Sequence, residues 1–318
     1  MAKYLVTGGA GFIGSHIVST LVKEGSEVII LDNFSSGKEE NLKEVINNVR
    51  LVKGDIRDLD RLKKITPGLD CIFHQAALKS VPKSVNDPLE YNEVNITGTL
   101  NVLLAAKENK VRRVVFASSS SIYGEVSKFP QKESVLPRLI SPYAQTKLAG
   151  EYWCRVFTHC YRLETVSLRY FNVFGPRQAL DDEYAVVIPK FVVSILNDQP
   201  PPIYGNGKQS RDFTYINNVV QANILAAKRK SASGRVFNVA CGKSVRVLDL
   251  IQEINKILAK NIKPRFLPLR KGDVFKTLAD TKYAQEYLGF KPRVSFEEGL
   301  KRTIEWFKGK YKSDGKNG

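Results

Sequence analysis

The sequence contains few of the residues that build disulfide scaffolds and metal centres. Its 318 residues include four cysteines and three histidines. The cysteines form no C-x-x-C pair, and His16, His74 and His159 fall in separate segments without the short spacing of metal ligands. We therefore expect a chain from a reducing compartment, without disulfides and without a bound metal.

Long apolar runs are also absent. No stretch approaches the roughly 20 apolar residues of a membrane-spanning helix, and the N-terminal MAKYLVTGG lacks the apolar segment of a secretion signal. Hydrophobic residues make up 43% of the chain and charged residues 25%, as in ordinary globular domains. These features predict a cytoplasmic protein with no membrane partner. The length suggests about two domains.

The charge balance is strongly positive. Lys and Arg number 49 against 32 Asp and Glu, a net charge of +17. Such an excess suggests an anionic partner: nucleic acid, anionic lipid or a phosphorylated small molecule. The basic residues are scattered among acidic ones, and no zinc-finger, helix-turn-helix or RNP pattern accompanies them. We therefore do not expect nucleic acid as the partner.

The first 170 residues alternate short β-branched runs with longer amphipathic segments, which is typical of a parallel sheet flanked by helices. The predicted strands are Lys3–Thr7, Glu27–Leu31, Val49–Lys53, Asp70–Gln75, Val111–Ser118 and Thr165–Tyr170. The predicted helices are Gly11–Glu24, Glu39–Asn47, Leu59–Ile65, Pro88–Asn109 and Tyr143–Tyr161. The expected fold class is α/β.

After Asn172 the pattern changes, because prolines and glycines break the chain into short pieces. A second, smaller unit is expected there. However, Arg211–Ile216, Asn218–Lys230 and Val236–Ala240 predict a strand, a helix and a strand that return to the first sheet. We therefore expect residues 1–172 plus 211–240 to form one domain, interleaved with a smaller C-terminal α/β domain of residues 173–210 plus 241–318.

A glycine-rich turn, VTGGAGFIG, closes the first predicted strand and opens the first helix. Because its glycines have no side chains, the backbone of this turn lets a pyrophosphate reach the N-terminus of the helix, where free N–H groups favour negative charge. Asp32 ends the second strand, where a carboxylate would bind the adenosine ribose and repel a 2′-phosphate. Together these features predict a Rossmann-type doubly wound parallel sheet that binds NAD rather than NADP.

Tyr143 and Lys147 lie one helical turn apart, so both side chains project from one face of the helix that begins there. A phenol with a pKa of about 10 acts as a base near neutral pH only where its phenolate is stabilised. Lys147 and the positive nicotinamide ring of NAD⁺ are both suited to stabilise it. Ser119 directly follows the predicted strand Val111–Ser118, close to the same sheet edge.

Several motifs extend this pattern along the chain. In order they read GGAGFIG, HQAALKSVPKSVNDP, SSSSIYG, SPYAQTK, RYFNVFGPRQ, SRDFTYINNV and RKGDVFKTLAD. With these motifs, nearly the whole chain resembles the extended short-chain dehydrogenase/reductases, and among them the nucleotide-sugar 4-epimerases. The resemblance implies a tightly bound NAD, a UDP-sugar substrate and a homodimer formed through the helices Pro88–Asn109 and Tyr143–Tyr161.

The resemblance also implies roles for the catalytic residues Ser119, Tyr143 and Lys147. Tyr143 would take the proton of the sugar 4-hydroxyl while the 4-hydrogen leaves as hydride to NAD⁺, and Ser119 would hydrogen-bond the 4-oxygen. The 4-keto sugar would then turn, and the hydride would return to its other face. In the related 4,6-dehydratases an Asp-Glu pair follows the catalytic Ser or Thr. Because Ser120 and Ser121 stand there, we expect no dehydratase activity.

Binding residues follow from the same resemblance. For the cofactor they are Gly8, Gly11, Phe12, Ile13, Gly14, Asp32, Asn33, Ser35, Ser36, Gly37, Asp55, Ile56, Gln75, Ala76, Ala77, Lys79, Asn95, Tyr143, Lys147 and Tyr170. For the UDP-sugar they are Ser80, Ser119, Ser120, Ser121, Tyr143, Asn172, Val187, Lys190, Pro202, Ile203, Tyr204, Arg211, Arg270, Asp273 and Thr277.

The choice of sugar depends on few positions. In the family the position four after Asp273 is a gate, where a small residue such as Thr277 admits an N-acetyl group at C2. Lys79, however, resembles the lysine that the UDP-glucose enzymes carry. We expect UDP-GlcNAc and UDP-GalNAc as the main pair and UDP-Glc and UDP-Gal as a second one. The alternative is a UDP-glucuronate 4-epimerase, or another extended short-chain dehydrogenase/reductase acting on a nucleotide sugar.

Overall fold

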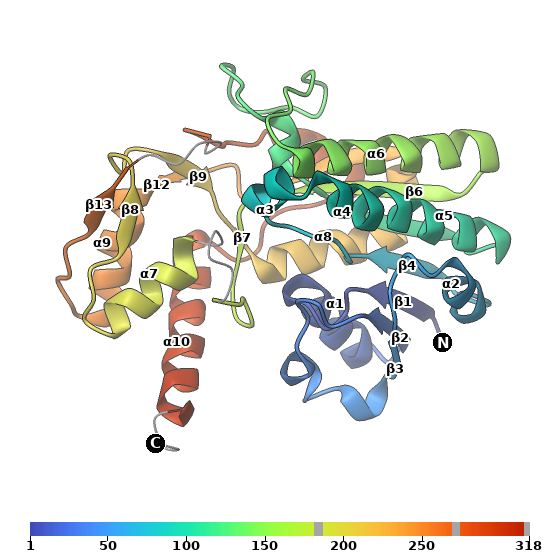
Figure 1. Cartoon of the computed structure of the whole chain (residues 1–318), viewed down its shortest axis with the longest axis horizontal. Coiled ribbons are helices and arrows are strands. Elements are labelled where there is room, and N and C mark those ends of the chain that lie inside the picture. Colours follow the sequence, from blue (N-terminus) through green and yellow to red (C-terminus); the bar gives the residue numbers. More distant parts are fainter. Residues whose placement is uncertain (181–186, 269–273, 315–318) are drawn as a thin grey trace.

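Seven parallel strands form the central sheet of the protein (Figure 1). A computed structural model describes residues 1–180, 187–268 and 274–314. The strands are β1 (Lys3–Thr7), β2 (Glu27–Asp32), β3 (Arg50–Lys53), β4 (Cys71–His74), β5 (Arg113–Ser119), β6 (Glu164–Tyr170) and β11 (Arg235–Val239). Their order is β11-β6-β5-β4-β1-β2-β3, so the direction of winding reverses between β1 and β4. In such sheets ligands bind outside the carboxyl ends of the strands at that reversal.

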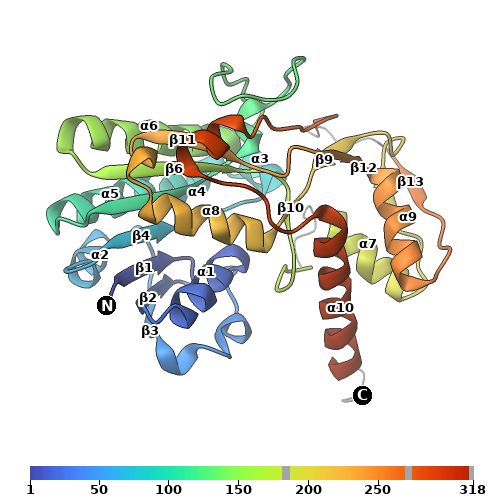
Figure 2. The same ribbon diagram turned by 180° about the vertical axis from the view of Figure 1, so that it is seen from behind.

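Helices cover both faces of this sheet (Figures 1 and 2). On one face α1 (Phe12–Lys23) packs against α8 (Ile216–Lys228). The other face carries α2 (Leu59–Ile65), α3 (Val81–Asn86), α4 (Pro88–Asn92), the π-helical turn η3 (Glu93–Thr97), α5 (Gly98–Glu108) and α6 (Pro142–Tyr161). Val6 and Leu5, neighbours on β1, belong to different apolar cores. Because both faces of the sheet are buried, its strands consist largely of consecutive apolar residues.

A smaller group of elements lies beside the sheet, with α7, α9 and α10 together (Figure 2). Its helices are α7 (Val187–Leu196), α9 (Val247–Leu258) and α10 (Phe296–Asp314). Its short strands are β7 (Val173–Phe174), β8 (Pro202–Tyr204), β9 (Ser210–Asp212), β10 (Thr214–Tyr215), β12 (Ser244–Arg246) and β13 (Arg265–Leu267). The remaining turns are η1 (Glu39–Leu42), η2 (Ile46–Asn48), η4 (Ser120–Tyr123), η5 (Lys230–Ala232) and η6 (Ala284–Leu288).

The α/β fold with a parallel sheet is confirmed. All six strands predicted in the first 170 residues are present with ends within two residues of the prediction, and β11 joins the sheet beside β6. How the chain divides into domains stays a prediction. All four cysteines are described and are free. Over the described ranges, none of the helices combines the length and apolarity needed to cross a bilayer.

The predicted helix Glu39–Asn47 is wrong. Two short 3-10 turns, η1 and η2, replace it. The segment is tied to the glycine turn, because Asn41 Nδ2 and the backbone N of Lys38 both donate to the carbonyl oxygen of Ala10. Its buried residues Leu42 and Val45 are three apart, which matches the 3-10 period.

The predicted strand Arg211–Ile216 is also wrong as a member of the central sheet. The segment instead forms β9, which pairs with β12, and β10, which pairs with β7. The Asp212 carboxylate accepts hydrogen bonds from the backbone N–H groups of Cys241, Gly242 and Ala279. These long-range bonds hold β9 among loops away from the sheet. The chain returns to the sheet through α8 and β11.

Candidate active site

A cleft of about 500 Å³ lies where β1, β2 and β4 end. Every residue predicted to contact the cofactor lines it, except Asn95: Gly8, Gly11, Phe12, Ile13, Gly14, Asp32, Asn33, Ser35, Ser36, Gly37, Asp55, Ile56, Gln75, Ala76, Ala77, Lys79, Tyr143, Lys147 and Tyr170. Segments far apart in the sequence therefore converge at the reversal of strand order.

The glycine turn leaves no room for side chains. A Cβ on Gly14 would lie 2.1 Å from the carbonyl oxygen of Gly8, and Gly8 itself has a φ of +68°. Gly11 is the N-cap of α1, so no side chain covers the first N–H groups of that helix. These free donors and the positive end of the helix dipole suit a diphosphate.

The Asp32 carboxylate is held in place at the wall of the cleft. It accepts hydrogen bonds from the backbone N–H of Ala10 at 2.9 Å and of Phe34 at 2.8 Å. Burial raises the pKa of Asp32, and these two bonds oppose the rise. An oriented carboxylate at this position suits the hydroxyls of a ribose.

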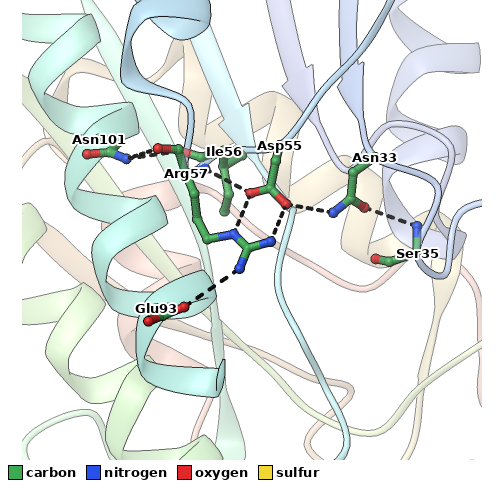
Figure 3. Close-up of polar contacts among 7 residues, drawn as sticks. All are labelled: Asn33, Ser35, Asp55, Ile56, Arg57, Glu93 and Asn101. Atoms are coloured by element: carbon green, nitrogen blue, oxygen red, sulfur yellow. Dashed lines mark hydrogen bonds and ion pairs between the residues drawn. The ribbon is translucent and has the colours of Figure 1, made fainter. Parts of the chain in front are cut away.

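Asp55 organises the neighbouring wall (Figure 3). Its carboxylate accepts two hydrogen bonds from the Arg57 guanidinium, at 3.0 and 2.9 Å, and one from Asn33 Nδ2 at 2.9 Å. The guanidinium lowers the pKa of Asp55 to about 2. Asn101 donates to the carbonyl oxygens of Ile56 and Arg57 and so fixes the backbone there. Arg57 was not among the predicted site residues.

Two of the predicted catalytic residues, Tyr143 and Lys147, line the cleft, and Ser119 directly follows the lining residue Ser118 on β5. The Ser119 Oγ accepts a hydrogen bond from Ser121 Oγ at 2.9 Å. Lys147 Nζ donates to the carbonyl oxygen of Ala117 at 2.9 Å and lies 5.9 Å from the centre of the Tyr143 ring. Burial lowers the pKa of Lys147 to about 7. Burial also raises the pKa of Tyr143, while the Ser119 hydroxyl opposes the rise.

Asn95 and Ser80 hydrogen-bond backbone groups near Lys79. Asn95 lies in the π-helical turn η3, and its amide binds both the backbone N–H and the carbonyl of Leu78, at 2.8 and 2.9 Å. It thereby fixes the loop that carries Lys79. Ser80 Oγ accepts the backbone N–H of Lys83 and so caps α3.

The predicted substrate residues form a second group. Thr277 Oγ1 accepts hydrogen bonds from Asn172 Nδ2 at 2.9 Å and from the backbone N of Asp212 at 3.0 Å. Arg211 lies next to them on β9 and donates to the carbonyl oxygen of Phe275 at 3.2 Å. The structure thus brings Asn172, Arg211 and Thr277 together.

The other predicted substrate residues are more dispersed. Ser120 and Ser121 belong to η4, Val187 and Lys190 to α7, and Pro202, Ile203 and Tyr204 to β8. The side chain of Ile203 is buried in the core. Arg270 and Asp273 lie outside the described residues.

Residues near the C-terminus also line the cleft, among them Trp306 and Lys310 of α10. Lys310 Nζ lies 3.3 Å from Glu40 Oε1, across a sequence separation of 270 residues. Arg177 lines the same cleft and donates to the carbonyl oxygen of Ser15 at 3.2 Å. No local pattern marks these residues, because their position depends on how α10 and the segment after β7 pack.

Comparison with known proteins gives a consistent result. The profile of the NAD dependent epimerase/dehydratase family matches residues 4–240. A UDP-N-acetylglucosamine 4-epimerase from Methanobrevibacter ruminantium M1, solved with UDP-N-acetylmuramic acid, is 45% identical with a TM-score of 0.93, covering 97% of this chain and 99% of its own. A UDP-glucose 4-epimerase from Thermotoga maritima, solved with UDP-glucose, is 38% identical with a TM-score of 0.93 and the same coverage.

A third solved structure carries the cofactor. It is a UDP-glucuronic acid 4-epimerase from Bacillus cereus in complex with UDP-glucuronic acid and NAD, 34% identical with a TM-score of 0.90. The alignment covers 97% of this chain and 100% of the other.

Proposed function

This chain belongs to the NAD dependent epimerase/dehydratase family, and we propose that it interconverts UDP-hexoses that differ at C4, with UDP-GlcNAc and UDP-GalNAc as the preferred pair. The observation that carries this proposal is that Tyr143 and Lys147 line the dinucleotide cleft together with Ser118, the residue that directly precedes Ser119 on β5. The reaction needs a base and a hydride acceptor on the same carbon.

The cleft fits NAD. The turn at Gly8, Gly11 and Gly14 leaves open space that a Cβ would fill, and Asp32 presents an oriented carboxylate. We therefore assign the diphosphate to the N-terminus of α1 and the adenosine ribose to Asp32. A nicotinamide bound in the cleft would supply a hydride acceptor and donor for C4 of the sugar.

The chain's own residues move the proton. Tyr143 takes the proton of the 4-hydroxyl and returns it once the sugar has turned, so the substrate loses and regains one proton and one hydride. Ser119 lowers the pKa of Tyr143 and would hydrogen-bond the sugar 4-oxygen. The buried charge of Lys147 favours the phenolate form of Tyr143. Product and substrate have the same oxidation state, so NAD stays bound through turnover.

Two features support the N-acetylated pair. Thr277 is small and belongs to the substrate group with Asn172 and Arg211. The relative that is 45% identical is a UDP-N-acetylglucosamine 4-epimerase. UDP-Glc and UDP-Gal are proposed as a second pair, which agrees with the relative solved with UDP-glucose.

UDP-glucuronate is the second candidate substrate, favoured by the 34% identical relative that binds it. A panel of purified UDP-sugars separates these possibilities, with the products resolved by chromatography. We expect 4-epimers from UDP-GlcNAc at the highest kcat/KM. If no 4-epimer forms from any of them, the proposal is wrong. Absorbance at 340 nm that rises with product would instead indicate a decarboxylase that releases NADH, and absorbance that falls would indicate a reductase that consumes it.

We also propose a homodimer through α4, α5 and α6. Leu89 on α4 and Tyr152 and Val156 on α6 are exposed, and α4 packs on α6. Burying such apolar side chains favours association. Sedimentation equilibrium measures the mass, and a monomer at micromolar concentration would contradict this proposal.

A further inference from the structure

The catalytic face of α6 packs against the end of β5. Tyr143 is the first residue of this face, Lys147 binds the carbonyl of Ala117, and the next residue on the same helical face, Glu151, accepts a hydrogen bond from Ser118 Oγ at 2.5 Å. Ser118 directly precedes Ser119. The catalytic face of α6 therefore includes a third polar residue, to which the proposed reaction assigns no role.

Glu151 is paired with Arg169 on the adjacent strand. Arg169 Nε donates to Glu151 Oε1 and Nη2 to Oε2, both at 2.8 Å, and both side chains are 5% exposed. Arg169 lies opposite Ser118 in the register of β5 and β6. Glu151 thus joins α6 to both strands at the edge of the sheet that faces the site.

Arg169 of the Glu151–Arg169 pair also contacts Tyr123, which follows Ser119 in the chain. The Arg169 guanidinium lies 4.9 Å from the centre of the Tyr123 ring, and Tyr123 ends the turn η4 that follows Ser119. The Tyr123 hydroxyl donates to Asn238 Oδ1 at 2.7 Å. Ser119 is therefore held from the preceding residue, Ser118, and from the end of the following turn, and both contacts lead to the Glu151–Arg169 pair.

We infer that Glu151 and Arg169 are positioning residues that hold the end of β5, and with it Ser119, against the face of α6 that carries Tyr143, an inference that rests on the proposed function. A buried ion pair adds little to the stability of a fold, because the free-energy cost of removing two charges from water offsets much of their attraction. Two parallel hydrogen bonds between a guanidinium and a carboxylate do, however, fix the orientation of both groups. A hydroxyl that interacts with both a base and a sugar oxygen needs such a fixed orientation.

The chain contains a matched control. A second buried arginine, Arg113, pairs with Glu164 at 2.6 Å across the same two strands at their opposite, amino-terminal ends. Arg113 Nη1 also donates to the carbonyl oxygens of Ala226 and Arg229 at the end of α8. Neither Arg113 nor Glu164 lines the cleft.

The experiment compares Ser118→Ala and Glu151→Gln with Glu164→Gln in the full-length protein. Each variant is measured for kcat, KM, NAD content and unfolding temperature. Ser118→Ala and Glu151→Gln should lower kcat at least about tenfold, with KM within about twofold and NAD retained. Glu164→Gln should lower the unfolding temperature and keep kcat. The inference is overturned if the first two variants keep kcat as well.

Ser118→Ala removes one hydroxyl and changes no charge, so it also serves where Glu151→Gln fails to fold. The charged group that faces Tyr143, Lys147, is unchanged in this variant. Ser119 lowers the pKa of Tyr143, so displacing Ser119 should move the acidic limb of the kcat profile to higher pH. A merely structural role would leave the limb in place.

A crystal structure of Ser118→Ala gives a readout that does not depend on turnover. The Ser119 Oγ should lie farther from the Tyr143 hydroxyl than it does in wild-type crystals. An unchanged distance overturns the inference, even where the wild-type protein acts on none of the UDP-sugars. Inactive wild type with a displaced Ser119 would instead overturn the proposed function and leave the positioning role supported.

Discussion

The ammonium of Lys147 lies 5.9 Å from the centre of the Tyr143 ring, one turn further along the same face of α6. Lys147 is buried and Tyr143 is partly exposed. Desolvation lowers the pKa of Lys147 to about 7 and raises that of Tyr143. Burial therefore disfavours the charged form of each group alone, whereas an ammonium and a phenolate at this distance would stabilise each other. In the proposed reaction this pairing would let a phenol act as a base near neutral pH.

Tyr143→Phe should lower kcat about 10²- to 10⁴-fold, the range of general acid–base catalysis. The variant keeps the ring and removes only the hydroxyl, so NAD content should remain that of the wild type. Tyr152→Phe, an exposed position on the same helix, is the control and should keep full activity. A fully active Tyr143→Phe variant would show that another group is the base.

Lys147→Met should shift the acidic limb of the kcat profile to higher pH. Without the buried cation, the pKa of Tyr143 rises, and each unit of rise leaves about tenfold less phenolate at neutral pH. Lys107→Met is a matched control, because Lys107 Nζ lies 5.0 Å from the centre of the Tyr161 ring at the surface. A pH profile shared by all three proteins would contradict the electrostatic role.

Gly14→Ala should abolish NAD binding. The new Cβ would lie 2.1 Å from the carbonyl oxygen of Gly8, so the turn that receives the diphosphate must open. Gly309→Ala is the control, because nothing lies within 4 Å of its Cβ, and alanine favours the helix by about 1 kcal/mol. The measurement is NAD released by acid from the purified proteins, and full NAD content in Gly14→Ala would refute the assignment.

Thr277→Tyr should suppress turnover of N-acetylated substrates far more than turnover of UDP-glucose, because the larger ring narrows the space assigned to the C2 substituent. Thr277→Ser keeps the oxygen that accepts from Asn172 and Asp212, and it should keep both activities. The comparison uses kcat/KM for each pair of sugars. Equal losses for both pairs would mean that Thr277 acts through folding rather than through substrate size.

His74 provides a pH-dependent test of the region behind the cleft. Thr99 Oγ1 donates to the carbonyl oxygen of Asn95 at 2.6 Å, so it accepts from His74 Nε2 at 2.9 Å. His74 Nδ1 therefore accepts the hydroxyl of Thr7 at 2.8 Å. This arrangement requires a neutral ring with its proton on Nε2.

Burial lowers the pKa of His74 from 6.5 to about 3. Between these values the unfolded chain binds a proton that native His74 does not, so stability falls as pH decreases from 6.5 towards 3. The free energy of unfolding of wild type should fall with decreasing pH by about 1.4 kcal/mol per pH unit more than that of His74→Gln. Parallel curves from urea unfolding at several pH values would refute a neutral His74.

The sequence alone determined the features that depend on short spacing. The glycine turn, Asp32 at the end of β2 and the pair Tyr143 and Lys147 follow from local periodicity, since a few residues fix their relative direction on a strand or a helix. The strands of the sheet could also be predicted from the sequence, because a strand that is buried on both faces must be a continuous apolar run.

Tertiary structure decided what joins distant segments. It brings Thr277 to Asn172 and Asp212, and it brings Lys310 to the cleft opposite Glu40. It also breaks the predicted helix at residues 39–47 and moves β9 off the central sheet. A hydrogen bond or an ion pair between separate elements forms only once their packing fixes the distance between them, and no spacing along the chain contains that distance.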